Sequence, residues 1–195
     1  MVLDFMQGVS NMTKYKFEKQ KKTLDKAEFA EIIEKGAFKS RYIPIDVQRA
    51  FLVLLYYLGL RVSELLPLTI NAFEWTEDYV FIDAPPIKMG VERPRFKLSL
   101  QLPFMKYVSL AWYIARRRKS KVFPFTRGTA WNIVKRVMPE HYPHFFRLNR
   151  ATSFLNKGWP PNKIRRWFGW KTFKTVESYL GYAEKDMKDL SEGLE

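Results

Sequence analysis

The first hydrophobic pattern in the chain has the spacing of a helix. In residues 25–35 apolar side chains return every three or four positions, as they do on one face of a helix. Thr23 or Asp25 can serve as the N-cap of this segment, and Gly36 stands where the pattern stops. The pattern therefore predicts a short amphipathic helix at the start of the folded region.

The most apolar segment begins at Asp46 and ends at Gly59. Its side chains are apolar on nearly all sides, which indicates a helix in the middle of the core. Ser63 can cap a second, short helix that Pro67 would close. Arg61 is then expected on the turn between the two helices, held by rigid neighbours.

A change of period marks two short extended segments, residues 79–83 and 96–100. A proline-rich, basic connector joins them, and the pair predicts a β-hairpin or small sheet. Helical spacing then returns in residues 104–118, 129–138 and 144–156. The expected fold is mainly α with one small antiparallel sheet, an α+β arrangement.

The chain is expected to form one domain, because its 195 residues have the length of an ordinary single domain. Residues 1–22 are polar and basic without a long apolar period, which indicates a tail or linker. Residues 23–195 form the predicted domain. No internal repeat is visible.

The charge of the chain points to a polyanionic partner. It carries 34 basic and 20 acidic side chains, a net charge of +14, as is usual for proteins that bind nucleic acid. The alternative is that these are solvated helix faces of a lysine-rich, thermophilic protein. The candidate DNA-binding residues lie in basic clusters: Arg116, Arg117, Arg118, Lys163, Arg165, Arg166, Lys171 and Lys174.

Several classes of chemistry lack their residues. The chain has no cysteine and two histidines, which argues against a disulfide scaffold, a thiolate zinc site or metal catalysis. It has no phosphate-binding glycine loop, so no nucleotide cofactor is expected. The longest apolar run, residues 50–60, is too short to cross a bilayer. The sequence predicts a soluble protein without cofactor, metal or membrane partner.

Three segments carry a recognisable set of motifs: L-G-L-R-V-S-E-L-L-P-L-T at 58–69, H-F-F-R-L-N-R-A-T-S-F-L at 144–155 and F-G-W-K-T-F-K-T-V-E-S-Y at 168–179. In this order, with a basic hairpin between the first two, they resemble the signatures of the tyrosine recombinase, or phage integrase, family. The tyrosine follows Trp170 by nine positions, as in the family. The resemblance covers about residues 23–190.

The resemblance implies a role for individual residues. Arg61 and Arg147 would hold the scissile phosphate, with His144 and Trp170 beside it, and Tyr179 would attack the phosphorus. Lys88 on the hairpin, rather than Lys97, would protonate the leaving 5′-oxygen, and Glu64 would orient Arg61.

This set makes chemical sense at a phosphodiester. Planar guanidinium groups match the non-bridging oxygens in geometry and sign. Forming a phenolate at pH 7 costs roughly 4 kcal/mol unless neighbouring cations or a base assist, and His144 is the candidate base. The 3′-phosphotyrosyl link would store the bond energy, so that neither metal nor ATP is required.

Each residue also has a structural interpretation. Arg61 could cap carbonyl groups or pair with Glu64, and Trp170 could fill the core. His144 and Arg147 share a helix face, where such pairs are often structural. Tyr182 lies close to Tyr179 but does not fit the spacing.

The sequence departs from the family pattern in two places. Leu148 and Asn149 stand where a second histidine is common. Most family members carry an N-terminal DNA-clamping domain, and only a short basic tail precedes the catalytic part here. The C-terminal stretch 183–194 is amphipathic and in the family often docks on a neighbouring protomer; a plain surface helix is the alternative.

The predicted function is that of a site-specific DNA recombinase or integrase catalytic domain. The alternatives are a catalytically weak or inactive DNA-binding module of the same fold and a nicking-closing enzyme of the type IB topoisomerase kind. The expected partner is double-stranded DNA with attachment sites, bound by a homo-tetramer, with a monomer off DNA. The expected location is the cytoplasm, at the nucleoid, or the host-cell cytoplasm for a virus-encoded protein.

Overall fold

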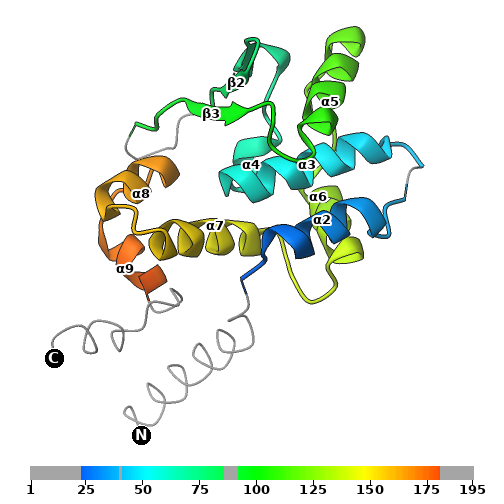
Figure 1. Cartoon of the computed structure of the whole chain (residues 1–195). Helices are drawn as coiled ribbons and strands as arrows, with labels where there is room; N and C mark the ends of the chain where they lie inside the picture. Colours follow the sequence, from blue (N-terminus) through cyan, green and yellow to red (C-terminus); the bar gives the residue numbers. More distant parts are fainter. Residues whose placement is uncertain (1–22, 40, 86–91, 181–195) are drawn as a thin grey trace, which may run out of the picture.

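The computed structural model describes residues 23–39, 41–85 and 92–180, without the side chain of Leu180. Helices surround one central helix, and a small antiparallel sheet lies at one side (Figure 1). The predicted fold class, mainly α with a small antiparallel sheet, is confirmed. The expected tail at 1–22, the hairpin residue Lys88 and the C-terminal stretch 183–194 lie outside the described residues.

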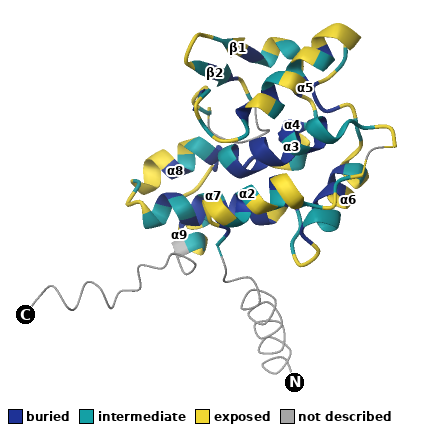
Figure 2. Cartoon of the chain, turned by 45° about the vertical axis from the view of Figure 1, so that its right-hand side comes forward, coloured by how far each residue is buried: buried dark blue, intermediate teal, exposed yellow. Residues whose placement is uncertain are grey.

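The central helix is α3, Ile45–Leu58, and it carries the core. All six side chains from Ala50 to Leu55 are fully buried. Helices α5, Met105–Arg118, and α7, His144–Asn156, pack against it, and burial is concentrated where they meet it (Figure 2). An all-round apolar helix is stable only in such surroundings, so the interpretation of this segment as a buried helix is confirmed.

The first helix is α2, Lys26–Lys35, and its start is fixed by a capping box. The Asp25 carboxylate accepts the Glu28 N–H at 2.8 Å, and the Glu28 carboxylate accepts the Asp25 N–H at 3.1 Å. Two of the helix's unpaired N–H groups are thereby satisfied. Of the two candidate caps, Asp25 rather than Thr23 holds the position.

The turn after α3 sets the direction of Arg61. Gly59 ends α3 with a φ of +63°, a left-handed conformation that favours glycine. Helix α4, Val62–Leu65, then begins with Arg61 itself as N-cap. The prediction that Ser63 caps this helix is wrong, because the Glu64 side chain reaches back to the Arg61 N–H at 2.8 Å and fixes the start two residues earlier.

The sheet has three strands rather than two: β1, Phe73–Trp75, β2, Tyr79–Ile82, and β3, Phe96–Ser99, in the order β1-β2-β3. Val80 pairs with Leu98, and Ile82 pairs with both Phe73 and Phe96 across antiparallel ladders. These side chains are buried and form the face toward the core. Strand β1 follows a short 3-10 helix, Ile70–Ala72, and its three residues are too few for a period.

The described helices after α5 are α6, Arg127–Val137, then α7, α8, Pro161–Phe168, and α9, Lys174–Leu180. The last three form a second, smaller hydrophobic cluster, while α6 packs into the main core. Helix α6 begins two residues before the predicted 129–138, because the Thr126 hydroxyl caps it by accepting the Thr129 N–H. The small cluster joins side chains of α7, α8 and α9, and Tyr179 packs against it.

Gly59 should be the more sensitive of two glycines with positive φ. A Cβ at Gly59 would lie 2.8 Å from Arg150 Cβ and 2.9 Å from a Phe168 ring carbon, whereas one at Gly158 (φ +69°) would have no neighbour within 4 Å. We expect Gly59→Ala to lower the free energy of unfolding by about 3 kcal/mol and Gly158→Ala by about 1 kcal/mol. Urea unfolding monitored by tryptophan fluorescence measures both; equal losses would show that the clash at Gly59 is relieved at no cost.

Candidate active site

Three guanidinium groups meet at one carboxylate, that of Glu64. Glu64 Oε1 lies 3.0 Å from Arg61 Nη1 and 2.7 Å from Arg93 Nη2, and Oε2 lies 3.5 Å from Arg147 Nη1. Burial alone would raise the pKa of this carboxyl, but the Arg61 N–H, Arg93 and Arg147 together hold the pKa below its usual value. The cluster therefore carries one negative and three positive charges.

Arg147 is the most buried member of this cluster, with 1% of its surface exposed. Nη1 donates to the Gly59 carbonyl at 3.1 Å and Nη2 to the Phe168 carbonyl at 2.9 Å. Its guanidinium also lies over the rings of Phe168 and Trp170, at 4.7 and 5.4 Å. Burial lowers its pKa to about 10, against the pull of Glu64, so it stays charged at neutral pH. Arg147 is thus fixed between the ends of α3 and α8.

Arg93 belongs to the cluster, and the sequence analysis missed it. It lies just before β3, with a side chain 6% exposed, and Nη2 donates to both Glu64 and the Phe168 carbonyl, the latter at 3.1 Å. Its Nε and Nη1 are buried without a hydrogen-bond partner among the described residues. The sequence signal available was weak, one arginine among several in a proline-rich connector.

Tyr179 is held by a stack of aromatic rings. The Phe168 and Trp170 rings stack at 4.6 Å, and the Trp170 and Tyr179 rings stack at 4.9 Å with 13° between their planes. Trp170 is 5% exposed, so its indole fills the small cluster as well as contacting Tyr179. The nine-residue spacing thus brings Tyr179 onto Trp170, which also contacts Arg147.

Opposing effects act on the hydroxyl of Tyr179. Burial raises the pKa of this phenol, while the positive charges of Arg147 and Arg61 lower it, and the net shift is upward. The two arginines are therefore close enough to act on the tyrosine. Its resting form at neutral pH is the neutral phenol.

His144 stands at the start of α7, one turn before Arg147, with part of its ring in solvent. Desolvation by the surrounding protein, and then the charges of Arg147 and Arg61, lower its pKa below 6.5. His144 is therefore neutral at pH 7 and able to accept a proton. The charges of Arg147 and Arg61 thus act on the His144 imidazole as well as on the Tyr179 phenol.

Other candidate residues lie away from this cluster. Lys97 has its ammonium 3.7 Å from the centre of the Tyr79 ring, on the exposed face of the sheet. Arg116, Arg117 and Arg118 end α5, on a different side of the molecule from α8 (Figures 1 and 2). The basic side chains of α8 and the segment after it are exposed or half-buried: Lys163, Arg165, Arg166, Lys171 and Lys174.

Arg165 and Asn149 make structural contacts. Arg165 Nη1 donates to the Lys171 carbonyl at 3.3 Å, and its guanidinium lies 4.9 Å from the centre of the Phe173 ring. Asn149 is buried and its Oδ1 accepts the Leu24 N–H at 2.8 Å. Asn149, which departs from the family pattern, therefore fastens the start of the described chain to α7.

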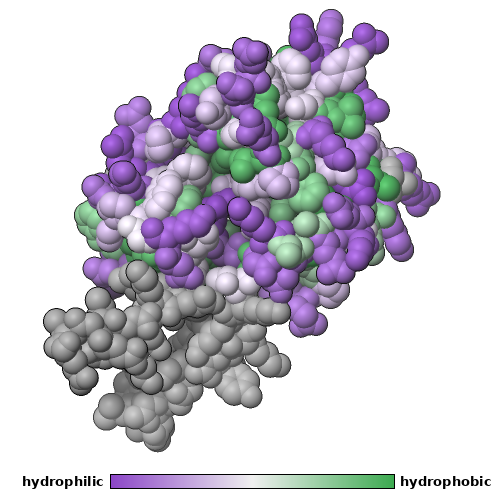
Figure 3. Space-filling model, in the orientation of Figure 1, coloured by the Kyte–Doolittle hydropathy of each residue, from purple (hydrophilic) through white to green (hydrophobic). Residues whose placement is uncertain are grey.

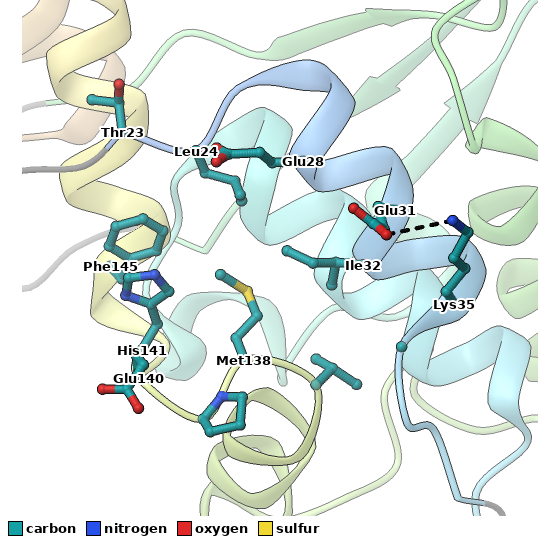
Figure 4. Close-up of a pocket in the computed structure, with 13 residues that line it drawn as sticks. Thr23, Leu24, Glu28, Glu31, Ile32, Lys35, Met138, Glu140, His141 and Phe145 are labelled. Atoms are coloured by element: carbon teal, nitrogen blue, oxygen red, sulfur yellow. Dashed lines mark hydrogen bonds and ion pairs between the residues drawn. The ribbon is translucent and has the colours of Figure 1, made fainter.

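Two cavities of about 510 Å³ each differ in character. The first lies between α2 and the loop before α7 (Figure 4), where apolar side chains such as Ile32 and Met138 are joined by Glu28, Glu31 and Glu140. Carboxylates make it a poor site for a phosphate. The second opens beside Arg61 and His144. It adjoins the arginine cluster, so only this cavity bears on the candidate site.

The face in Figure 3 is largely hydrophilic, with smaller hydrophobic areas between. Within residues 23–39, 41–85 and 92–180, no three His, Cys, Asp or Glu side chains gather as a metal site would require. No helix of this described part is long and apolar enough to span a membrane.

Removing the charge of Glu64 should destabilise the fold. In Glu64→Gln, two buried guanidinium groups lose their counter-charge, and we expect the free energy of unfolding to fall by roughly 3–5 kcal/mol at pH 7. Because the pKa of Glu64 is lowered by folding, its contribution is present above the carboxyl's usual pKa and is lost as the pH falls through the lower value in the folded state. The parent and the variant should therefore converge in acid.

Glu31→Gln is the matched control. Glu31 pairs with Lys35 at 3.4 Å, but both side chains are about 70% exposed, so the change should cost less than about 1 kcal/mol. Chemical denaturation of both variants between pH 3 and 7 measures the difference. Equal losses at pH 7 would contradict the account of Glu64 as the counter-charge of the cluster.

Comparison with solved structures places the fold. The chain is similar to the XerH site-specific recombinase bound to difH substrate (TM-score 0.67, 16% identity, 88% of this chain and 52% of that one) and to the XerA recombinase (0.60, 19%, 88% and 61%). It also resembles the Tn1549 transposon integrase in complex with transposon right end DNA (0.57, 16%, 89% and 65%). The chain thus spans between half and two thirds of the length of these proteins.

The family follows from the sequence itself. No curated protein matches the chain. The sequence profile of the phage integrase family matches residues 22–186, most of the chain, and includes all three motifs. The chain belongs to the phage integrase family.

Proposed function

We propose that the chain is the catalytic domain of a site-specific DNA recombinase or integrase, which cleaves and rejoins DNA strands through a 3′-phosphotyrosyl intermediate. One observation carries the proposal: Arg61 and Arg147 share the Glu64 carboxylate, and the ring stack brings Tyr179 within their electrostatic reach. An anion-binding centre beside a tyrosine has the composition that phosphodiester cleavage requires.

The arginines would stabilise the charge that develops on the phosphate. As Tyr179 attacks, negative charge grows on the two non-bridging oxygens, and preorganised guanidinium groups compensate it without reorganising. Arg147 is held by two carbonyl groups and Arg61 by Glu64, so neither has to be ordered when DNA binds. The net positive charge of the cluster favours the dianionic transition state over the monoanionic substrate.

The proposed step balances bonds and protons. The Tyr179 Oη–P bond forms while the bond from phosphorus to the 5′-oxygen breaks, and the phenolic proton passes to His144. The departing 5′-oxygen takes a proton from Lys88, which stays a prediction because it lies outside the described residues. Attack by a 5′-hydroxyl on the phosphotyrosine reverses the step and rejoins the strand. The bond energy is conserved, so neither a metal nor ATP takes part in the proposal.

Glu64 and Arg93 would act as positioning residues. Glu64 accepts both the backbone N–H and the guanidinium of Arg61, which fixes the angle of that side chain. Arg93 holds Glu64 from the opposite side and binds the last carbonyl of α8. Their contacts support roles in the alignment of Arg61 rather than in contact with the reacting atoms.

The proposed substrate is double-stranded DNA with specific attachment sites, bound by a homo-tetramer. The net charge of +14 and the exposed basic side chains of α8 support a DNA partner. The XerH and Tn1549 proteins bind DNA substrates in their own structures, which supports the same partner here. Action on DNA fits a cytoplasmic location, at the nucleoid or in a host cell.

Covalent attachment to DNA tests the proposal. Nicked suicide duplexes can be tiled across a sequence that the Tyr179→Phe chain selects from a random pool. The parent chain should become linked to one duplex through Tyr179 and run as a slower band after denaturation. Tyr179→Phe should bind the same duplex without becoming linked, while Tyr182→Phe, the matched control, should attach like the parent.

The rival functions predict different results. Binding without attachment by any of the three chains would favour an inactive DNA-binding module and contradict the proposal. Attachment by Tyr179→Phe but not by Tyr182→Phe would show that the nucleophile is Tyr182 and would contradict the proposed role of Tyr179. Relaxation of supercoiled plasmid without recombinant product would favour the topoisomerase function.

The lowered pKa of His144 gives the reaction a specific dependence on pH. A base works only when unprotonated, so attachment by the parent should not depend on pH near neutrality and should decline only below the usual pKa of a histidine. We expect His144→Gln to be slower by roughly 10²–10⁴-fold and to lack this acid limb. Single-turnover attachment rates between pH 5 and 8 measure both, and the same acid limb in the variant would show that another group titrates.

A further inference from the structure

The second cavity adjoins the candidate active site at Arg61 and His144. Arg127 and Trp131 of α6 also line it, together with Tyr142. Tyr179 and Trp170 are not among its lining residues and pack in the small cluster of α7, α8 and α9. A DNA strand whose phosphate sits at the arginine cluster therefore has this hollow next to it.

The charge of the cavity suits an anion. Two guanidinium groups and an imidazole line it, and its described lining residues include no carboxylate, although Arg61 is paired with Glu64. Arg127 is exposed and is the first residue of α6, and Gly128 beside it exposes backbone at the same helix end. The positive end of the α6 dipole adds to the charge of Arg127.

The shape of the cavity suits a strand better than a free ion. At about 510 Å³ it is far larger than one phosphate, and Trp131, 46% exposed, forms part of its wall. The Trp131 ring stacks on Tyr142 at 5.9 Å with 11° between the planes, so the wall is flat and apolar. A sugar–phosphate backbone presents these two surfaces together, an apolar sugar edge and a charged phosphate.

We propose that this cavity is a second phosphate-binding site, which holds the cleaved strand at a phosphate next to the scissile one. Arg127 binds that phosphate and Trp131 packs against the adjoining sugar. This inference rests on the proposed function, because the neighbouring phosphate is defined by the one at Arg61 and Arg147. Two fixed phosphate positions on one strand set its register, and so decide which phosphodiester faces Tyr179.

Phosphate ethylation interference tests the inference by binding alone. The duplex is the one selected from a random pool, and every chain carries Tyr179→Phe so that no cleavage occurs. The reference chain should be blocked by ethylation at the scissile phosphate and at a neighbour. With Arg127→Ala, interference at the neighbour alone should disappear, affinity should fall roughly tenfold, and the slope of log affinity against log salt should decrease by about 1.

Arg41→Ala is the matched control, because Arg41 is an exposed arginine that lines neither cavity and its loss changes the net charge equally. It should keep both interference positions and the reference salt slope. An Arg127→Ala pattern identical to that of Arg41→Ala overturns the inference. So does an Arg127→Ala effect that maps by guanine methylation interference to a base and leaves every phosphate unchanged.

A second measurement does not depend on the variant's folding. A neutral methylphosphonate at the neighbouring position should weaken the reference chain by the same factor as Arg127→Ala and should not weaken the variant further. Additive effects at every flanking position overturn the inference. These readouts need no covalent attachment, so failure of the proposed function, attachment absent from the parent, remains distinct from failure of the second phosphate site.

Discussion

The Glu64 carboxylate is the contact on which the rest of the site depends. Arg61, Arg93 and Arg147 share this acidic group, which lies within 3.5 Å of all three. Two of those arginines are almost fully buried, and a buried guanidinium without a counter-charge is strongly unfavourable. One carboxylate cannot neutralise three cations, so the cluster keeps an excess of positive charge that a bound anion would neutralise.

The excess is tolerated because helix ends help to hold it. Gly59 ends α3 and Phe168 ends α8, and their carbonyl groups carry the negative ends of the two helix dipoles. Arg147 binds both carbonyls, and Arg93 binds the second one. The same contacts fasten α3 to α8 through side chains rather than through backbone pairing. The stability of the fold and the anion-binding centre therefore share their interactions, and a change in one affects the other.

The sequence specified those parts that short-range physics determines. The all-round apolar pattern of α3, and the two short extended segments on either side of the proline-rich connector, were sufficient to predict that helix and strands β2 and β3. Strand β1 was not predicted, because three residues show no period. The cap of α4 was predicted at the wrong residue, because the Glu64 side chain fixes the start of the helix at Arg61 instead of Ser63. Arg93 was missed for a different reason: its partners lie 29 and 75 residues away in the chain, and no local pattern encodes them. The motifs predicted the gathering of Arg61, Arg147, Trp170 and Tyr179, while the position of Lys88 stays a prediction.

The state of Tyr179 constrains how the proposed reaction can proceed. Burial against Trp170 raises the pKa of the phenol, and only the charges of Arg147 and Arg61 oppose that rise. A phosphate bound at those arginines brings its own negative charge, which offsets their effect and disfavours a phenolate further. A free phenolate is therefore the wrong intermediate to expect. The proton has to leave during attack, as negative charge moves from the phenol to the phosphate oxygens, and this is why a base with a lowered pKa beside the arginines, His144, fits the proposed step.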